Sequence, residues 1–325
     1  MTGLASLFAP SPPTVGIEIG TRHVSVVRMG QGGHPSPIAS AAVEPLPAGA
    51  VSPALNEPNI TDRGAVSAAL GRAVDQAGAR RRRAVLVVPD SVGKVSLLRF
   101  DKVPERQQDL AELIRWQTRK SVPFRAEDAQ LTYSPAGPPD ETTGEFAVVL
   151  ARRDIVAEYE SLCAEAGVQV GVVDLATFNL INAVTTGGNA PGGDWLLVNA
   201  AGEYLSLAIL RGGRLLFFRH RGSEGEGSLE DVVHQTAMYY EDRLSGRGFK
   251  RVVLASAWPD AAPARRGDAA DPIEVRYQLE QRLNVRVDSV DPRPAVTFAD
   301  RISLQPPLLD AIAPAVGLLL RERTA

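Results

Sequence analysis

The sequence predicts an α/β protein of two lobes that carries a small inserted α+β subdomain. The chain has 325 residues, 44% of them hydrophobic, which exceeds one ordinary core. Each half begins with three predicted antiparallel strands and then adds helices and further strands. Within the first half, residues 94–153 interrupt this plan with a strand, a helix and two more strands, a combination typical of an inserted subdomain.

The first half alternates strands with capped helices. Its predicted strands are residues 15–27 (two strands about a Gly-Thr-Arg-His turn), 37–46, 84–90 and 170–175. Residues 47–59 connect the third strand to a helix over residues 63–77, which Asp62 caps and Gly78 ends. Two further helices are expected at residues 153–166 and 176–184. Cys163 falls on the apolar face of the first of these, so it is predicted to be a core residue and not a nucleophile.

The interrupting unit has its own pattern. Strands are expected at residues 94–100, 129–135 and 145–151. The helix between them is predicted to start at Pro104, to align Leu110 and Ile114 on one stripe, and to end before Pro123.

The second half repeats the plan of the first, although not its sequence. Its predicted strands are residues 195–199, 204–210, 214–220, 251–257 and 284–290, with a hairpin turn at Gly212-Gly213. Helices are expected from Ser228 to residue 244, over residues 273–283 and from residue 308.

These elements predict four parts. Residues 1–14 form a flexible tail, and residues 94–153 form the inserted subdomain. The first lobe comprises residues 15–93, 154–188 and 306–325, and the second comprises residues 189–305. The Gly-rich stretch at residues 185–194 is predicted to be a flexible joint between the lobes.

Composition excludes several functions. With 35 basic and 38 acidic residues, the net charge of −3 argues against a binder of nucleic acid. No apolar run is long enough to span a bilayer. A single cysteine excludes an internal disulfide framework and fits a reducing compartment. The four histidines have no ligand spacing, so no metal site is expected.

One basic run stands out. Residues 80–83 read "RRRR" immediately before a predicted buried strand. Two interpretations remain open, namely a solvated loop and a contact with anionic lipid or an acidic partner.

Four stretches share the pattern of one known family. They are "VGIEIGTRHVSVVRM", "PERQQDLAELIRWQTRKSVPFRAEDAQLTYSP", "EYESLCAEAGVQVGVVDLATFNLINA" and "AIAPAVGLLLRE". On these residues the chain resembles the PilM group of type IV pilus assembly proteins, which are actin/Hsp70-like ATPases related to FtsA and to the cytoplasmic part of GspL. The resemblance implies a two-lobed actin-like (RNase H-like) fold, with the last helix returning to the first lobe.

The family clamps ATP and Mg²⁺ between two hairpins, and the resemblance implies that this site is degenerate here. Glu18 stands where the family has Asp, whereas Gly20 is kept and Thr21 lies in the same turn. In the second hairpin, Asn199 replaces the metal-holding Asp and Ala201 replaces a Gly, which removes a charge and narrows the phosphate space.

The family's third nucleotide element, a Gly-Gly pair, is also altered. Ser256 and Ala257 stand in its place, and Trp258 can fill the purine space. We therefore expect no catalytic residues, no required cofactor and no ATP hydrolysis, while binding of ATP with Mg²⁺ is left open.

In the PilM group, a groove between the first lobe and the inserted subdomain receives the short cytoplasmic N-terminal tail of the bitopic membrane protein PilN. The resemblance implies that the partner-binding residues here are Leu97, Leu98, Ile114, Trp116, Lys120, Pro123 and Phe124. An extended peptide can add to a strand edge and bury its side chains in pockets. For Trp116 and Phe124 the alternative is a place in the local core.

The expected function is that of a cytoplasmic scaffold in a pilus or type II secretion-like platform. A PilN-like partner would hold it at the inner membrane, and a platform ATPase and a homo-oligomer are further partners left open. The alternatives are an active ATPase of the same fold that uses Glu18 as its acid, and a self-assembling filament protein.

Overall fold

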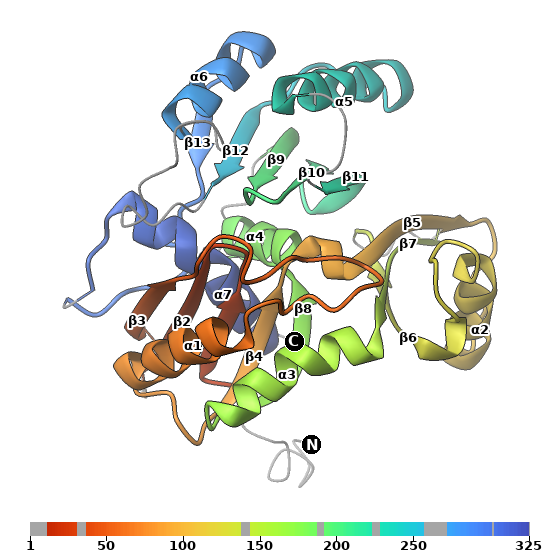
Figure 1. Cartoon of the computed structure of the whole chain (residues 1–325). Coiled ribbons are helices and arrows are strands. Elements are labelled where there is room, and N and C mark those ends of the chain that lie inside the picture. Colours follow the sequence, from red (N-terminus) through yellow and green to blue (C-terminus); the bar gives the residue numbers. More distant parts are fainter. Residues whose placement is uncertain are drawn as a thin grey trace, which may run out of the picture.

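Three β-sheets form the framework of the protein. The computed structural model describes residues 12–30, 37–137, 144–186, 192–222, 228–256, 272–300 and 302–324. Within these residues there are two five-stranded sheets and one three-stranded sheet. Figure 1 shows the two larger sheets stacked one above the other, with the small sheet projecting to one side of the lower one.

The first lobe is built on a mixed sheet in the order β3-β2-β1-β4-β8. Its strands are β1 (Val15–Ile19), β2 (His23–Met29), β3 (Ile38–Pro45), β4 (Arg83–Val88) and β8 (Gln169–Leu175). The first three strands pair antiparallel, and β4 runs parallel to both β1 and β8. The strands are mostly apolar because helices cover both faces of this sheet.

The second lobe repeats this arrangement in the order β11-β10-β9-β12-β13. Its strands are β9 (Asp194–Ala200), β10 (Tyr204–Arg211), β11 (Arg214–Gly222), β12 (Arg251–Ala255) and β13 (Val287–Ser289). The same order in both lobes, with three antiparallel strands followed by two parallel ones, is the arrangement that the resemblance predicts for an actin-like protein. The expected fold class is confirmed.

Helices separate and cover the two sheets. The outer helices of the first lobe are α1 (Arg63–Ala77) and α3 (Arg153–Glu165), and those of the second are α5 (Leu229–Arg243) and α6 (Pro272–Leu283). Between the sheets lie α4 (Ala176–Thr185) and α7 (Pro306–Thr324), which pack against each other. Because α7 is apolar on all sides, it is buried almost throughout its length, and it packs on β1, β2 and β4 as expected.

The inserted subdomain is the sheet β5-β7-β6 with one helix. It consists of β5 (Gly93–Phe100), α2 (Gln107–Thr118), β6 (Ala129–Pro135) and β7 (Gly144–Arg152). The short helix η2 (Asp90–Val92) joins it to β4. Leu110, Ile114 and Val148 are among the side chains that form its core.

Most predicted elements are confirmed, and three begin two or more residues from their expected start. The strand expected from residue 284 begins at Val287. The helix expected from Pro104 begins at Gln107, because Arg106 is extended, offers no capping side chain, and precedes the first buried position at Leu110. The last helix begins at Pro306, two residues early, where proline is well accommodated. Cys163 is fully buried in the core, and burial raises the pKa of its thiol to about 12.

Parts of the predicted tail and joint lie outside the described residues, namely residues 1–11 and 187–191. In the part of the chain that the structure describes, no helix combines the length and the apolar character needed to cross a membrane.

Candidate functional site

Two hairpin turns face each other between the lobes. Residues 20–22 join β1 to β2, and residues 201–203 join β9 to β10. Each turn is closed in the same way, since the N–H of Gly20 donates to the carbonyl of His23 and the N–H of Ala201 donates to that of Tyr204, both at 3.0 Å. The two N–H groups are therefore engaged within their own hairpins.

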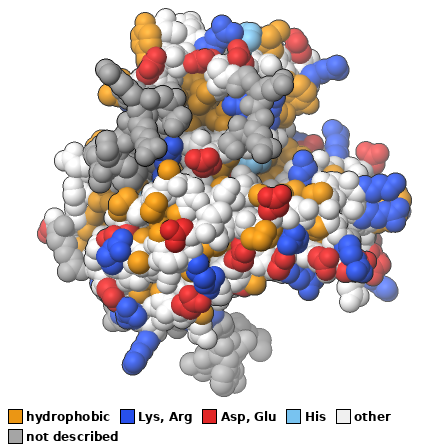
Figure 2. Space-filling view, viewed as in Figure 1, with side chains coloured by type: hydrophobic (Ala, Val, Ile, Leu, Met, Phe, Trp, Pro, Cys, Tyr) orange, Lys and Arg blue, Asp and Glu red, His pale blue; other side chains and the backbone are white. Residues whose placement is uncertain are grey.

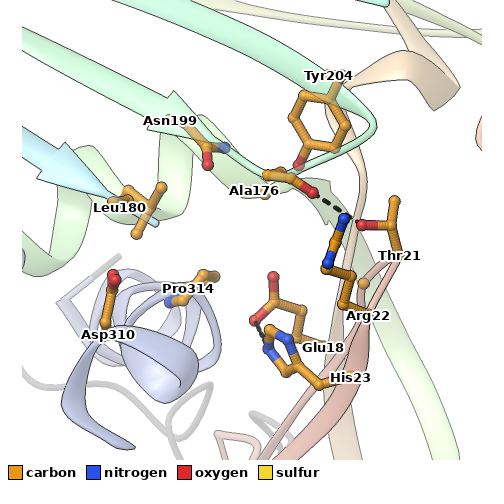
Figure 3. Close-up of a pocket in the computed structure, with 13 residues that line it drawn as sticks. Glu18, Thr21, Arg22, His23, Ala176, Leu180, Asn199, Tyr204, Asp310 and Pro314 are labelled. Carbon is orange, nitrogen blue, oxygen red and sulfur yellow. Dashed lines mark hydrogen bonds and ion pairs between the residues drawn. The ribbon is translucent and has the colours of Figure 1, made fainter. Parts of the chain in front are cut away.

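The two turns also touch directly. The hydroxyl of Thr21 donates to the carbonyl oxygen of Ala201 at 2.9 Å (Figure 3). Arg22 lies so close to Gly202 that a Cβ there would sit 2.6 Å from Arg22 Nε, and the φ of +83° at Gly202 also favours glycine. The two hairpin turns are thus in direct contact through Thr21 and Arg22.

A small cavity remains behind these turns. Its volume is about 40 Å³, and residues of β1, β2, α4, β9, β12 and α7 line it. Cavities that hold small organic ligands are roughly 300–1,000 Å³. This one has room for a few water molecules.

Acidic side chains converge on the cavity. Glu18 from β1 and Asp310 from α7 point into it and are each only 8% exposed (Figure 3). Among the described residues, Glu18 Oε2 and Asp310 Oδ1 have no hydrogen-bond partner, although His23 Nε2 lies 3.6 Å from Glu18 Oε2. The cluster therefore holds two buried acids beside one imidazole, and its net charge depends on which of them carry protons.

The protonation of this cluster follows from its burial. Burial raises the pKa of Asp310 to about 7, against the opposing hydrogen bond that Ser256 N donates to it at 2.9 Å. Burial lowers the pKa of His23, but the adjacent carboxyl group of Glu18 outweighs burial, so that the pKa is raised above its usual value. His23 Nε2 also lies 3.3 Å from the carbonyl oxygen of Ala311.

Asn199 belongs to a second buried network. Its amide Nδ2 donates to Asp90 Oδ2 at 3.3 Å and to Thr177 Oγ1 at 3.0 Å. The backbone N–H of Thr177 donates to the same carboxylate, at Oδ1, at 3.0 Å, and the Thr177 hydroxyl donates to Oδ2. Asn199 lines the cavity, but its amide serves as a donor between the lobes. Sequence reasoning did not identify Asp90, which carries no local motif.

A histidine completes the contact between the lobes. The ring of His220 in β11 lies between two hydroxyl groups, Ser91 Oγ at 3.1 Å from Nε2 and Ser206 Oγ at 3.0 Å from Nδ1. Burial lowers the pKa of His220, which favours the neutral ring. Ser91 comes from η2 at the start of the inserted subdomain, so this bridge and the Asp90 network together fix the second lobe against the first.

Some of the predicted nucleotide-site residues lie together, and others lie outside the described residues. Glu18, Gly20, Thr21 and Asn199 do lie together around the cavity. Ser256 lies beside them through its hydrogen bond to Asp310, whereas Ala257 and Trp258 lie outside the described residues. In the described ranges, no three His, Cys, Asp or Glu side chains are arranged to hold a metal ion.

A larger groove separates the first lobe from the inserted subdomain. Two cavities of about 320 and 400 Å³ follow each other along it and share Thr132, Val149, Val173 and Asp174. One wall is β6 and β7, and the other is β8 with parts of α3 and α4. Both β6 and β8 are edge strands of their sheets. Edge strands present unpaired N–H and C=O groups, to which an extended chain can add.

Charged groups stand at both cavities of this groove. Arg153 and Glu160 of α3 line the first cavity, and Arg321 of α7 lines the second, where it forms an ion pair with Asp174. Burial raises the pKa of Asp174 despite the neighbouring guanidinium.

The expected partner-binding residues lie outside this groove. Ile114 is fully buried in the subdomain core, and Leu98 and Phe124 pack against that core. Trp116 is 62% exposed on α2, where the Arg119 guanidinium lies 5.5 Å from its ring centroid. Leu97, Lys120 and Pro123 are exposed. None of these seven residues is among those that line the two cavities of the groove.

Comparison with known proteins agrees with this architecture. Residues 16–245, more than half of the chain, match the family model described as type IV pilus assembly protein PilM. The structure is similar to one in the PilM–PilN type IV pilus biogenesis complex, with 19% identity, coverage of 96% of this chain and 99% of that one, and a TM-score of 0.77.

A more distant similarity is to the cytoplasmic domain of EpsL, an inner-membrane component of the type II secretion system of Vibrio cholerae. Identity is 10%, coverage is 82% of this chain and 93% of that one, and the TM-score is 0.46. From the match over residues 16–245, the chain belongs to the PilM family of type IV pilus assembly proteins.

Proposed function

We propose that this protein is a scaffold that binds the cytoplasmic N-terminal tail of a PilN-like membrane protein in the groove between β6 and β8. Family membership and the fold similarity to a chain of the PilM–PilN complex support this proposal. The observation that carries it is the placement of two sheet edges, β6 and β8, along one continuous groove.

The groove suits an extended peptide. Added to β8, such a segment gains main-chain hydrogen bonds that do not depend on its sequence. Its alternate side chains would enter the two cavities, which are walled by apolar residues such as Val149, Val173 and Phe178. In the ion pair of Asp174 with Arg321, the carboxylate can accept hydrogen bonds from the peptide and the guanidinium can donate them.

We further propose that the protein neither hydrolyses ATP nor requires it. This proposal is supported by the hydrogen bond between Thr21 and Ala201 and by the packing of Arg22 on Gly202, which bring together the two turns that hold phosphates in the family. A further support is that the buried carboxyl groups of Glu18 and Asp310 line the cavity behind these turns. Asn199 has no charge for a magnesium ion, and its amide is engaged with Asp90.

Function and location follow from these two proposals. The contact with the partner's tail would hold the protein at the inner face of the membrane, within a pilus or secretion platform. The lobes then act as a rigid support for the groove, since the closed hairpins and the Asp90 network fix the second lobe on the first.

The groove can be tested by blocking it. Thr132 is exposed on β6 and lines both cavities, so Thr132→Trp fills the groove without disturbing a core. A synthetic PilN-type tail peptide at a hundred times its Kd is expected to stabilise the wild type by about 2.7 kcal/mol. The variant is expected to bind the peptide at least tenfold more weakly in isothermal titration calorimetry, a loss of about 1.4 kcal/mol.

Two controls make this test specific. Thr132→Ser keeps the groove open and is expected to bind like the wild type, and Trp116→Ala tests the exposed surface of α2 in the same assay. Mg-ATP is expected to leave the melting temperature unchanged. Loss of peptide binding in Trp116→Ala with full binding in Thr132→Trp would contradict the assignment of the groove.

A further inference from the structure

Residues 80–83 are four arginines that the proposed function does not use. The first three lie in the loop between α1 and β4, and Arg83 begins β4. Residues 75–83 contain these four arginines and one acidic residue, Asp75, which gives the segment a charge of +3. Figure 2 shows Lys and Arg side chains projecting from the foot of the first lobe, where Figure 1 places this loop. Arg80 forms an ion pair with Asp75, and Arg82 Nε donates to the carbonyl of Gly78 at 3.3 Å. Arg81 and Arg83 are exposed.

The backbone of this loop is held in one conformation. Gly78 ends α1 in the left-handed region, and its N–H donates to the carbonyl of Asp75 at 3.0 Å. Arg81 N–H donates to the carbonyl of Gly167 at 2.7 Å, and Gln169 N–H donates to that of Arg82 at 3.1 Å. The loop is therefore tied to the turn between α3 and β8, and it presents its guanidinium groups from a fixed support.

Arg81 is unusual in its conformation. Its φ of 58° lies in the left-handed region, which favours glycine or asparagine and disfavours a long side chain. In the described part of the chain, the Arg81 side chain forms no hydrogen bond or ion pair. A left-handed residue whose guanidinium has no hydrogen-bond or ion-pair partner among the described residues is consistent with a contact outside the molecule.

The loop stands at one end of the groove between β6 and β8. Arg83 Nη2 lies 3.8 Å from the position that a Cβ would take at Gly171, and Gly171 lines the first cavity of the groove. A peptide that leaves the groove at this end therefore passes beside the arginines.

We propose that residues 80–83 form a docking surface for the anionic headgroups of a phospholipid bilayer. Guanidinium groups bind phosphate oxygens through paired N–H donors, and several of them on one fixed loop suit a plane of phosphates. The choice of a bilayer over an acidic protein rests on the proposed function. A partner tail that leaves the groove at this end and continues into a membrane span would bring lipid headgroups next to these arginines.

The test uses the full chain and vesicles without any partner. Co-sedimentation is measured with vesicles of phosphatidylcholine alone and with vesicles that contain roughly 30% phosphatidylglycerol. At about this content of anionic lipid, basic residues near the surface add measurable binding free energy. The wild type is expected to bind only the anionic vesicles and to be released by 0.5 M salt, at which the screening length is roughly 4 Å.

The loop variant is Arg81→Gln/Arg82→Gln/Arg83→Gln, and the matched control is Arg63→Gln/Arg72→Gln/Arg293→Gln. The control removes the same charge from arginines that pair with Glu165, Glu44 and Asp291. The loop variant is expected to bind anionic vesicles about tenfold more weakly or worse, and the control less than twofold more weakly. Equal losses in both, or binding of the wild type to soluble polyglutamate and not to vesicles, would overturn the proposal.

Arg81→Gly separates binding from folding. Glycine relieves the left-handed conformation, so the melting temperature is expected to stay the same or rise while vesicle binding falls by severalfold. A lower melting temperature with unchanged vesicle binding would make Arg81 a structural residue and contradict the proposal. Binding of the tail peptide by these variants is expected to be unchanged, so a failure of the lipid surface is distinguishable from a failure of the groove.

Discussion

Replacement of Asn199 by aspartate is expected to destabilise the protein strongly, although aspartate is the residue that the family pattern has at this position. The Asn199 amide donates to the buried carboxylate of Asp90 at 3.3 Å. A second carboxylate in its place would leave two buried like charges adjacent to each other. We expect a loss of about 3–5 kcal/mol in the free energy of unfolding at pH 8, the usual cost of an uncompensated buried charge.

The loss depends on pH in a definite direction. One carboxyl group of the pair must hold a proton in the folded state, which raises its folded pKa above the unfolded value of about 3.9. The folded variant then binds more protons than the unfolded chain, so its stability is present below pH 4 and is lost as the pH rises through the folded pKa. Urea unfolding of the variant and the wild type at pH 4.5 and pH 8 measures this difference.

A charge exchange serves as the control. In Asp90→Asn/Asn199→Asp the amide and the carboxylate change places, so the pair keeps one charge and one donor. This double variant is expected to recover more than half of the loss at pH 8. Equal stability of Asn199→Asp and the wild type at pH 8, or the same loss at both pH values, would contradict the proposed role of Asn199 as an uncharged donor between the lobes.

Alanine at Gly317 is expected to destabilise the packing of α7 against α4. A Cβ at this position would overlap the carbonyl oxygen of Asn179. The two residues belong to the backbones of packed helices, so neither can move aside independently. Overpacking of this kind costs about 1–3 kcal/mol, and more where backbone must shift. The free energy of unfolding in urea measures the effect.

The same substitution at Gly71 is the matched control. Gly71 lies inside α1, and no atom comes within 4 Å of the position that a Cβ would take. Gly71→Ala is therefore expected to stabilise the protein by about 0.5–1 kcal/mol through helix propensity alone. If both variants shift stability in the same direction, the close approach of α7 and α4 is not what Gly317 provides.

Much of the fold could be predicted from the sequence because its elements are local. The alternation in residues 15–27 specifies a hairpin, and Asp62 with Gly78 marks both ends of α1, as the cap geometry confirms. The start of α2 was predicted wrongly because proline at 104 is compatible with a helix start but does not require one. The burial that decides where a helix begins depends on tertiary contacts.

The sites were harder to predict for a different reason. Glu18, Thr21 and Asn199 could be brought together because each occupies a hairpin position that the family pattern names. Asp90 and Asp310 follow no such pattern, and only the fold brings them to Asn199 and Glu18. No periodicity in the sequence indicates that β6 and β8 are edge strands. The side chains that line the groove between them could therefore not be predicted.

The measurement that tests the central claim most directly is amide hydrogen exchange of the full chain, with the tail peptide and with Mg-ATP. The peptide is expected to slow exchange along β6 and β8, and Mg-ATP to leave the amides of residues 20–22 and 201–203 unchanged. Protection of these turn amides by Mg-ATP, together with unchanged exchange in β6 and β8 on addition of the peptide, would contradict the account.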